Sequence, residues 1–514
     1  MSQSKKYPAQ TVVVIGAGPV GLAAASHLVS RNITPIVIEA GDGPGAAISR
    51  WGHIRLFSPW RFNIDAAARR ILQANDWVAP NLDHLPTGAE LVDQYLHPLA
   101  ESAELAPHIQ YGTEVVAVSR SGVDKTRTIG RDDRPYLVRT RTADGVFTDV
   151  IADAVIDASG TWGHANPLGA HGIAAPGESE AAWAMAGALP DVLGSDRDQF
   201  AGKHTLVVGT GHSAANTLIA LATLEAEETG TRISWAIRGE SAARLYGGGD
   251  ADALPARGKL GTDIKQLVAD GRVTLMANFV IDELRSGDGA VTVTGRSADE
   301  PVSLEVDVIA GATGFRPDLG ILREIRLDMD ASVEAPAALA PLIDPNFHSC
   351  GTVPAHGEKD LAHPDEGFYI VGMKSYGRAP TFLMATGYEQ VRSVAAALAG
   401  DRAAADEVHL ELPETGVCSS GPTITADDGS VVFDKNTESC CGPAADTSCS
   451  TDSTSSCGST PPARGLSTGL LHGYSGEITG DSEASSGCGP APATDLSPGA
   501  EALCCSTAPT AANA

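Results

Sequence analysis

Short runs of β-branched residues alternate with stretches rich in Ala and Leu through most of the chain. Two clear runs begin at Thr11 and His204, and each leads into a stretch whose apolar residues have helical spacing. The alternation continues to about residue 410. This pattern predicts an ordered α/β protein over that part of the 514-residue chain, which is long enough for about three units of roughly 150 residues.

The pattern changes at about Pro413. Beyond it Ser, Thr, Gly, Pro, Ala and Asp dominate, with twelve acidic residues and only two basic ones, Lys435 and Arg464. Such a segment buries too little apolar surface to offset its ordering entropy, so we predict that it is mostly disordered. Within it, the stretch "TITADDGSVVFDK" favours a hairpin around Asp428-Gly429.

The run from Thr11 leads into the glycine pattern G-x-G-x-x-G, a helical stretch and a second strand that ends at an acidic residue. In this arrangement the first glycine permits a tight turn, the second lets backbone approach a pyrophosphate, and the third lets helix and strand pack closely. The acidic residue can accept hydrogen bonds from ribose hydroxyls. The alternative is a glycine turn that binds nothing. The predicted contacts of this first dinucleotide site are Gly16, Ala17, Gly18, Pro19, Gly21 and Glu39.

A second copy of the pattern begins near His204. Ala214 replaces its third glycine, which the pattern tolerates. Its second strand ends at Arg238, where a guanidinium can bind a 2′-phosphate through bidentate hydrogen bonds. The second site is therefore predicted to prefer NADP(H), the alternative being a solvated arginine at a strand end. The predicted contacts are Gly209, Gly211, His212, Ser213, Ala214, Arg238 and Arg244.

Two such units about 190 residues apart suggest that one holds FAD and the other delivers hydride from NADPH. The chain here resembles the two-dinucleotide-binding-domain flavoproteins, the superfamily of flavin-containing monooxygenases and thioredoxin reductases. The segments Asp157–Trp162 and Gly311–Leu319 are similar to the paired crossing segments of that superfamily, and Glu366–Leu398 to its last FAD strand and the helix aimed at the flavin. The resemblance covers about residues 8–400. It adds Gly160, Gly314 and Gly372 to the expected cofactor contacts.

The resemblance also implies a domain organisation. Residues 1–165 and 320–410 would form a discontinuous FAD-binding domain, with an NADP(H)-binding domain inserted at 166–319. Residues 411–514 would form the acidic, Cys-rich tail. The expected fold class is therefore α/β, with two Rossmann-like three-layer domains followed by a mostly disordered tail.

The dithiols of related reductases are missing. Thioredoxin reductases carry C-x-x-C in the NADPH domain, and glutathione- and mercuric-reductase-like enzymes carry C-x-x-x-x-C after the FAD strands, whereas this chain has only Cys350 before Cys418. The flavin must then reduce oxygen, a small acceptor or a mobile thiol. This favours a monooxygenase-like enzyme or a small-molecule reductase, although the fuller F-x-G-x-x-x-H fingerprint of the monooxygenases is not intact.

Two stretches are expected to border the flavin. The stretch Ser49–Asp65 contributes Arg50 and Trp51 as cofactor contacts and Arg61 as a catalytic candidate, because arginines could stabilise a reduced flavin anion or an anionic substrate. Surface cation–π packing is the alternative. The stretch Asn346–Pro364 places Cys350, the second catalytic candidate, among His348, His356 and His363 as an activated thiolate or soft-ion ligand. The alternative is a small buried cysteine with scattered loop histidines.

Eight of the nine cysteines lie from Cys418 onward. Their spacing does not suit a zinc finger, but thiolates on a flexible acidic chain suit soft ions such as arsenite, mercury or copper(I). The candidate ligands are the vicinal pairs Cys440, Cys441, Cys504 and Cys505. Flavoproteins with thiol-rich tails resemble those associated with arsenic resistance. Two alternatives stay open: a general flavin monooxygenase whose tail plays no part in chemistry, and a soft-metal-binding protein with a redox-sensing flavin domain.

The formal net charge of −28 argues against nucleic acid and anionic membranes as partners. No apolar run approaches the ~18 residues that span a bilayer. The first apolar run continues into a glycine motif and has no cleavage site, so we interpret it as a strand and not a signal peptide. These features indicate the cytoplasm, where thiols stay reduced. The expected partners are oxygen or a small-molecule acceptor, and arsenite or another thiophilic ion; a homodimer is left open.

Overall fold

The computed structural model describes residues 9–246, 255–345, 353–380 and 382–410, together with two short strands, β16 (Ile424–Thr425) and β17 (Val431–Val432). The chain divides into two units, Met1–Asn436 and Thr437–Ala514. The second unit lies outside the described residues, so the description below concerns the first. β16 and β17 pair antiparallel, which confirms the hairpin predicted around Asp428-Gly429.

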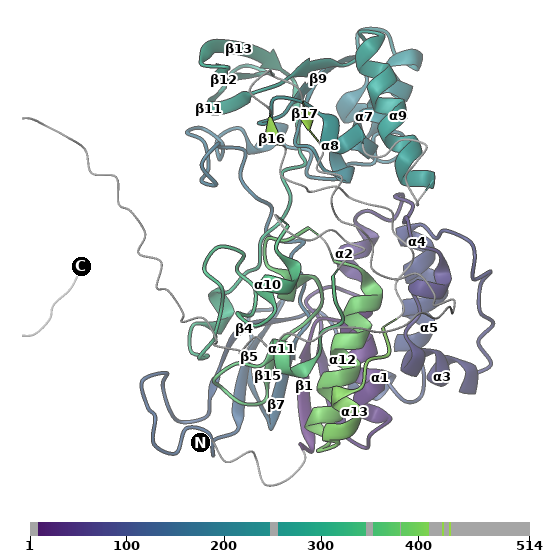
Figure 1. Ribbon diagram of the computed structural model, residues 1–514, viewed down its shortest axis with the longest axis vertical. Coiled ribbons are helices and arrows are strands. Elements are labelled where there is room, and N and C mark those ends of the chain that lie inside the picture. The colour runs from purple at the N-terminus through teal and green to yellow at the C-terminus, as the bar shows by residue number, and fades with distance from the viewer. Residues whose placement is uncertain are drawn as a thin grey trace, which may run out of the picture. The chain divides into compact units, whose positions relative to one another are not determined.

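A five-stranded parallel sheet carries the first glycine pattern (Figure 1). Its strand order is β15-β7-β1-β2-β3, so the strand that leads into the pattern lies at the centre. Helix α1 (Pro19–Val29) begins directly after Gly18, contains Gly21 and packs against α12 (Met384–Leu398). The strands are β1 (Thr11–Ile15), β2 (Thr34–Ile38), β3 (Ile109–Gln110), β7 (Ala154–Asp157) and β15 (Phe368–Ile370).

A four-stranded parallel sheet carries the second glycine pattern in the order β10-β9-β8-β14. Helix α7 (His212–Glu227) follows β8 and packs against α9 (Pro255–Ala269). The strands are β8 (His204–Val208), β9 (Arg232–Ala236), β10 (Thr274–Met276) and β14 (Val308–Gly311). The two parallel sheets confirm the predicted α/β fold with Rossmann-like units, while the domain boundaries proposed from the sequence stay a prediction.

Each parallel sheet is interrupted along the chain by a three-stranded antiparallel sheet. The first of these lies between β3 and β7 in the sequence, and the second between β10 and β14. Their strands are β4 (Thr113–Arg120), β5 (Tyr136–Thr142), β6 (Phe147–Ala152), β11 (Phe279–Ser286), β12 (Val291–Ser297) and β13 (Glu300–Val306).

Short helices connect the strands. The α-helices are α2 (Ala46–Ser49), α3 (Ala66–Ala74), α4 (Gly88–Leu91), α5 (His97–Ala100), α6 (Arg197–Phe200), α8 (Ala243–Tyr246), α10 (Ala340–Ile343), α11 (Glu358–Leu361) and α13 (Arg402–Asp406). Single 3₁₀ turns lie at Trp60–Phe62, Ala106–His108, Ala182–Ala184, Gly320–Leu322 and Gly372–Tyr376, and a π-helical turn at Val92–Leu96.

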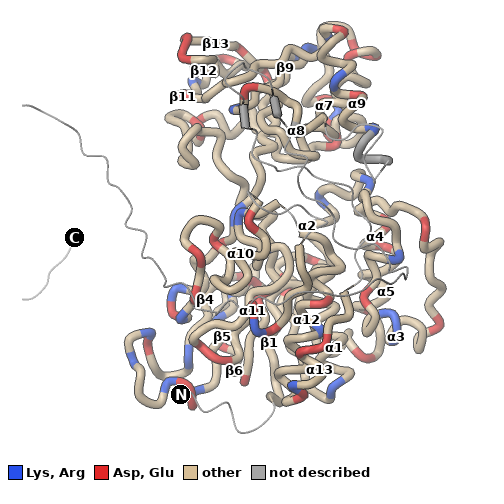
Figure 2. Tube along the Cα trace, viewed as in Figure 1, with Lys and Arg blue, Asp and Glu red and all other residues tan. Residues whose placement is uncertain are grey.

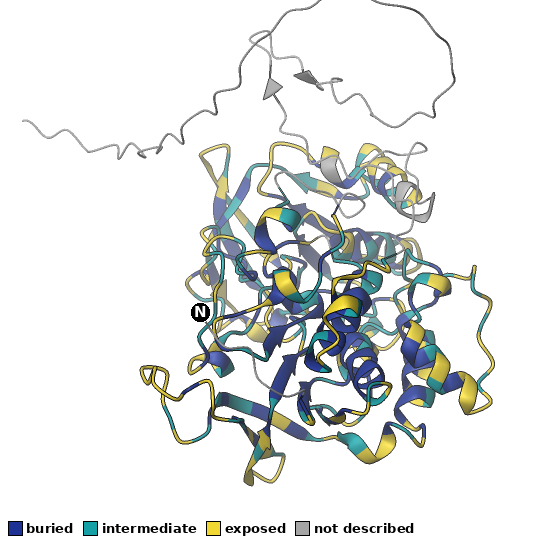
Figure 3. Ribbon diagram, turned by 60° about the horizontal axis from the view of Figure 1, so that its bottom comes forward, coloured by how far each residue is buried: buried dark blue, intermediate teal, exposed yellow. Residues whose placement is uncertain are grey.

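The central strands are buried on both faces, as Figure 3 shows by their dark blue colour. Val12, Val13 and Val14 of β1 have no exposed surface, which is the near-continuous apolar run expected of a parallel sheet covered by helices or strands on either side. Acidic and basic residues are intermingled along the described chain (Figure 2). Among the described residues, no helix is long and apolar enough to cross a membrane.

Candidate nucleotide-binding and active site

The first glycine turn meets the steric demands predicted from its spacing. Gly16 follows β1 with φ +99°, and a Cβ there would lie 2.8 Å from the carbonyl oxygen of Ala158. A Cβ on Gly21 would lie 2.0 Å from the carbonyl oxygen of Gly16. A larger residue at position 16 would therefore push the turn away from the segment after β7. A larger residue at position 21 would push α1 away from the turn.

The middle glycine of the pattern has a different environment. Gly18 is the N-cap of α1, Pro19 occupies the first turn, and a Cβ on Gly18 would meet nothing within 4 Å. The backbone N–H groups at the start of an eleven-residue helix and the positive end of its dipole favour an anion. Open space over such a helix start is the cradle that the pyrophosphate of a dinucleotide would fill.

Glu39 lies beside this turn at the end of β2. Its Oε2 accepts a hydrogen bond of 2.7 Å from the backbone N–H of Ala17, and its Oε1 accepts one of 2.8 Å from Gly41. The half-buried carboxylate is thus held at one place with one bond to each oxygen. Each oxygen keeps acceptor capacity for the ribose hydroxyls that the sequence pattern predicts.

The second glycine turn repeats this construction. Gly209 follows β8 with φ +128°, and a Cβ there would lie 2.1 Å from the carbonyl oxygen of Ala312. Gly211 is the N-cap of α7, with nothing within 4 Å of a Cβ. Ala214 is fully buried, so this turn accommodates one Cβ at the position where the first pattern has Gly21. The two turns therefore offer equivalent anion cradles.

The residues that follow the second turn touch the predicted flavin-bordering stretch. The ring of His212, the first residue of α7, lies 5.0 Å from the ring of Phe57. Ser213 is half-buried in the same turn of helix. Part of the stretch Ser49–Asp65 thus lies against the start of α7.

Arg238 follows β9 and is exposed. Its one hydrogen bond within the described residues, from Nη1 to the carbonyl oxygen of Ala170, is long at 3.4 Å. The guanidinium therefore keeps donors for a ligand, as the predicted 2′-phosphate contact requires. The side chain of Arg244 lies outside the described residues, so its assignment stays a prediction.

Replacing Arg238 by glutamate is expected to remove most of the preference for NADPH over NADH. A carboxylate would repel the 2′-phosphate that a guanidinium binds. A hydrogen bond to a charged group contributes about 1.5–3 kcal/mol, so the ratio of the two kcat/KM values should change by roughly 10- to 150-fold. Steady-state kinetics with both nucleotides measure the ratio. Arg232→Glu, at the opposite end of β9, is the matched control and should leave it unchanged. Equal kcat/KM values for NADH and NADPH in the wild-type protein would show that the assignment of Arg238 is wrong.

The second predicted crossing segment, Gly311–Leu319, pairs with residues that follow the first one, Asp157–Trp162. Ala165 and Phe315 form an antiparallel bridge, and the side-chain amide of Asn166 donates to the carbonyl oxygen of Thr313 at 3.1 Å. Gly160 and Gly314 occupy equivalent places three residues beyond the ends of β7 and β14, with φ +69° and +85°. The structure thus places both glycines in the turns that lie against Gly16 and Gly209.

Aromatic side chains join the flavin-bordering stretch to these segments. The Trp51 ring centroid lies 6.5 Å from that of Trp162, which lies 5.1 Å from that of Phe315. The Trp51 ring also fills the space beside Gly88, where a Cβ would approach it to 2.9 Å. Arg50 is exposed next to Trp51. These contacts bring Trp51 to the crossing segments, as its predicted role requires.

Arg61 has other partners. Its guanidinium forms an ion pair with exposed Asp83 and lies 5.0 Å from the centroid of the Phe62 ring. This is the surface cation–π packing that was the alternative for this arginine, and its catalytic role stays a prediction without a contact to support it. Cys350 and the tail cysteines Cys440, Cys441, Cys504 and Cys505 lie outside the described residues.

The last strand of the first sheet leads into a turn that packs on α1. Gly372 has φ +68°, and a Cβ there would lie 3.3 Å from Val20 in the first turn of α1. A Cβ on Gly387, in the first turn of α12, would lie 2.7 Å from Val20. The start of α12 and the Gly372 turn are therefore close neighbours of the first glycine turn.

Sequence reasoning did not identify three residues at this edge of the sheet as site residues: Lys374, Asp157 and Ser159. Lys374 Nζ donates to Asp157 Oδ2 at 2.7 Å and to the hydroxyl of Ser159 at 3.0 Å. The ammonium and carboxylate side chains are 1% and 0% exposed. The only signal in the sequence is a lysine four residues after the apolar strand in "FYIVGMKSYG", and its partner Asp157 lies more than two hundred residues away.

Two of the three loop histidines, His356 and His363, are buried, and His348 lies outside the described residues. His356 donates from Nδ1 to the carbonyl oxygen of Pro354 at 3.0 Å and accepts at Nε2 from Gln390 at 2.9 Å. His363 accepts at Nδ1 from the backbone N–H of Asp328 at 3.2 Å. Burial lowers the pKa of His356 and lowers that of His363 to about 4. Within the described part of the chain, no group of His, Cys, Asp and Glu could hold a metal ion.

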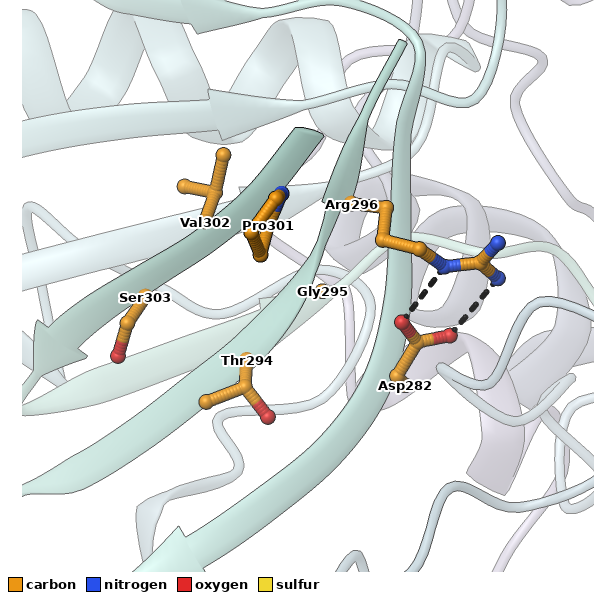
Figure 4. Close-up of a pocket in the computed structure, with 7 residues that line it drawn as sticks. All are labelled: Asp282, Thr294, Gly295, Arg296, Pro301, Val302 and Ser303. Atoms are coloured by element: carbon orange, nitrogen blue, oxygen red, sulfur yellow. Dashed lines mark hydrogen bonds and ion pairs between the residues drawn. The ribbon is translucent and has the colours of Figure 1, made fainter. Parts of the chain in front are cut away.

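A hollow of about 390 Å³ lies on the β11–β13 sheet, away from both glycine patterns in the sequence. Figure 4 shows Arg296 and Asp282 side by side at its edge, joined by hydrogen bonds of 2.9 and 3.1 Å. The charged groups are thus satisfied by each other. None of the residues that line it belongs to the predicted site. They are Asp282, Thr294, Gly295, Arg296, Pro301, Val302 and Ser303.

Solved structures share this architecture. The bacillithiol disulfide reductase of Bacillus cereus matches with a TM-score of 0.56 and 19% identity, over 76% of this chain and 99% of that one. The FAD-bound cadaverine monooxygenase of the desferrioxamine pathway from Erwinia amylovora matches with a TM-score of 0.53 and 12% identity, over 78% of this chain and 97% of that one. At these identities the likeness shows the fold alone.

Sequence comparison gives the family. A ferredoxin–NADP reductase from Rhodospirillum rubrum is 26% identical over 367 residues, which are 70% of this chain and 88% of that protein. Residues 13–338 match the family described as pyridine nucleotide-disulphide oxidoreductase. The match spans both glycine patterns and confirms the predicted FAD- and NADP(H)-dependent oxidoreductase. The chain belongs to the pyridine nucleotide-disulphide oxidoreductase family.

Proposed function

We propose that this protein oxidises NADPH and passes the electrons, through FAD, to oxygen or a small acceptor, in the manner of a flavin monooxygenase. One observation supports this most strongly. Two equivalent glycine turns with open helix starts occur in a sequence that has no pair of cysteines before Cys418. The chain can therefore hold two dinucleotides, but its nucleotide-binding part carries no internal dithiol that could take electrons from a flavin.

Each nucleotide is assigned to one turn by its strand-end residue. Glu39 suits the unmodified ribose of FAD, because its carboxylate accepts from hydroxyls and repels a 2′-phosphate. Arg238 suits NADPH for the opposite reason. FAD, when bound, accepts hydride from NADPH and gives two electrons to an acceptor. The backbone N–H groups at the starts of α1 and α7 would hold the two pyrophosphates.

The acceptor is the open part of the proposal. The similar proteins named above include a monooxygenase, a disulfide reductase and a ferredoxin–NADP reductase, so oxygen, low-molecular-weight disulfides and a one-electron carrier are the classes to test. Aerobic and anaerobic NADPH oxidation by the full-length protein, measured with each class in turn, identifies the acceptor. FAD-loaded protein that fails to oxidise NADPH with any of them would contradict the proposal.

We further propose that the enzyme acts in detoxification of arsenic or another soft metal in the cytoplasm, with the tail thiols capturing the ion. The support is the distribution of cysteines: eight of nine lie from Cys418 onward in an acidic segment, where sulfur ligands suit soft ions. A tethered thiol raises the local concentration of a captured ion near the active site, by less for a long linker than for a short one. Cys350 would be the thiol that receives the ion.

A protein that ends at residue 410 is expected to bind FAD and to oxidise NADPH with oxygen at the wild-type rate. Its stimulation by dilute arsenite should fall, because the capturing thiols are gone, and saturating arsenite should restore the rate. Equilibrium dialysis should show several ions bound to the full-length protein and at most one to the truncated form. Equal ion binding by both forms, or no binding by either, would contradict the role proposed for the tail.

A further inference from the structure

The ion pair of Lys374 and Asp157 lies where the dinucleotide edge of the first sheet is expected to be. Asp157 is the last residue of β7 and stands in register with Ile15 on one side and Ile370 on the other. It is therefore level with the residue that precedes Gly16. In open parallel sheets, ligands bind outside the carboxyl ends of the strands, and this pair occupies that end.

The order of the strands tells which part of FAD comes closest to the pair. Glu39, the proposed ribose contact, directly follows β2, which pairs with β1 on one side. The strands β7 and β15 lie on the other side of β1 (Figure 1). A dinucleotide whose adenosine lies over β2 and whose pyrophosphate lies over the start of α1 must extend its flavin end toward β7 and β15. Lys374 thus lies on the flavin side of the Gly16 turn.

The polarity of the pair is uneven. The carboxylate of Asp157 accepts from Lys374, from the backbone N–H of Ser159 at 3.1 Å and from its hydroxyl at 2.6 Å. An ammonium has three N–H donors, and in the described part of the chain Lys374 uses two. The negative charge is therefore shared among three donors, while the positive charge keeps one donor to spare. Ser159 itself is exposed, so it links the buried pair to the edge where a ligand would lie.

The turn that carries Lys374 is held in place by a buried side chain of α12. The side-chain oxygen of Gln390 accepts from the backbone N–H of Gly372 at 2.7 Å, and its nitrogen donates to Ser375 and to His356 at 2.9 Å each. Both ends of the turn are thus fixed to one residue. Such support keeps the ammonium at a constant place as charge develops nearby, which is what electrostatic preorganisation requires.

We propose that Lys374 is a positioning residue for the flavin: through the Ala158–Gly160 turn and the field of its buried ammonium, it favours the reduced, anionic form of FAD over the oxidised form. This inference rests on the proposed function, since it assumes that FAD binds at the first glycine turn. A buried pair contributes little to stability by itself compared with apolar side chains of similar volume. Stability alone therefore does not account for the buried pair of Lys374 and Asp157, whereas an electrostatic effect on the flavin would.

The test uses the double variant Lys374→Met/Asp157→Asn, which removes both charges and leaves no lone buried ion. The reduced form of bound FAD should become about tenfold less favoured, which is about 30 mV for a two-electron couple, and the midpoint potential should fall. The single variant Asp157→Asn, which frees the ammonium from its counter-ion, should shift the potential upward. Spectroscopic redox titration of the FAD-loaded proteins measures both.

Arg131→Met is the matched control. Arg131 also belongs to a fully buried ion pair, with Asp365 at 2.7 Å, but that pair precedes β15 and so lies at the amino end of the sheet. This variant should lose stability without any change in potential. Unchanged potentials in both Lys374/Asp157 variants, with FAD bound, would overturn the inference and leave the pair a structural one. Wild-type protein that binds no FAD would overturn the proposed function as well, so the two failures are distinguishable.

Discussion

The Gly209→Ala substitution is expected to lower the free energy of unfolding by about 3 kcal/mol or more. Gly209 has φ +128°, a region that L-residues rarely adopt, and the new Cβ would lie 2.1 Å from the backbone oxygen of Ala312. That oxygen belongs to the segment directly after β14, which pairs with β8, so neither partner can move without breaking the sheet edge. Denaturant unfolding measures the loss, and NADPH turnover should fall with it.

Gly211→Ala is the control for this prediction. Gly211 belongs to the same turn, but it has negative φ and nothing within 4 Å of a Cβ. Alanine there should leave the free energy of unfolding near that of the wild type. Equal destabilisation by the two substitutions would mean that the close approach of Gly209 to Ala312 is not what fixes the turn.

Replacing Asp365 by alanine is expected to lower the free energy of unfolding by about 3–5 kcal/mol, the usual cost of breaking a buried ion pair from one side. Asp365 accepts hydrogen bonds of 2.9 and 2.7 Å from Arg131, and the guanidinium of Arg120 lies 3.9 Å away. All three side chains are at most 1% exposed. Removing the carboxylate leaves two buried guanidinium groups without their anion.

The pH dependence of unfolding provides a second signature. Burial alone would raise the pKa of Asp365, but hydrogen bonds from Arg131 and from the backbone N–H of Arg326 lower it below the usual value. A carboxyl whose pKa is lower in the folded state contributes stability that is present above its unfolded pKa and is lost as pH falls through its folded pKa. Wild-type stability should therefore fall on acidification below about pH 4, and the part due to Asp365 should be missing from the variant.

Asp149→Ala is the control for the buried pair. Asp149 also accepts two hydrogen bonds from one arginine, Arg139, at 2.7 and 2.8 Å, but both side chains are substantially exposed. Solvent screens such a pair, so its loss should change stability very little. A similar loss in Asp149→Ala and Asp365→Ala would show that burial is not what makes the Asp365 cluster important.

The glycine turns could be predicted from the sequence because their demands are local. A positive φ at Gly16 and a 2.0 Å approach of a Gly21 Cβ to the chain both arise within six residues, and a short pattern records them. Glu39 was found for the same reason, since strand, turn, helix and strand follow one another directly. The family match and the parallel sheets confirm what these patterns indicated about fold and cofactors.

Contacts between distant segments could not be predicted in this way. Lys374 and Asp157 are 217 positions apart, and Arg131 and Asp365 are 234 apart; each lies in an unremarkable local sequence, and only the fold brings the partners together. Nearness in sequence is also a limited guide. His356 and His363 lie in one predicted loop, but the structure buries both and gives each its own backbone partner. The role predicted for Cys350 stays a prediction, because Cys350 and His348 lie outside the described residues.

The central claim is that the chain holds FAD at the first glycine turn and NADPH at the second. Gly18 and Gly211 both face open space, so alanine at either position should leave the protein folded and only obstruct the phosphates of one nucleotide. We expect Gly18→Ala to weaken FAD binding at unchanged NADP⁺ binding, and Gly211→Ala to weaken NADP⁺ binding at unchanged FAD content. The decisive measurement is the pair of dissociation constants for FAD and NADP⁺ in the two variants and the wild type. This reciprocal pattern is the predicted result, and a loss of FAD in Gly211→Ala, or no loss in Gly18→Ala, would contradict the account.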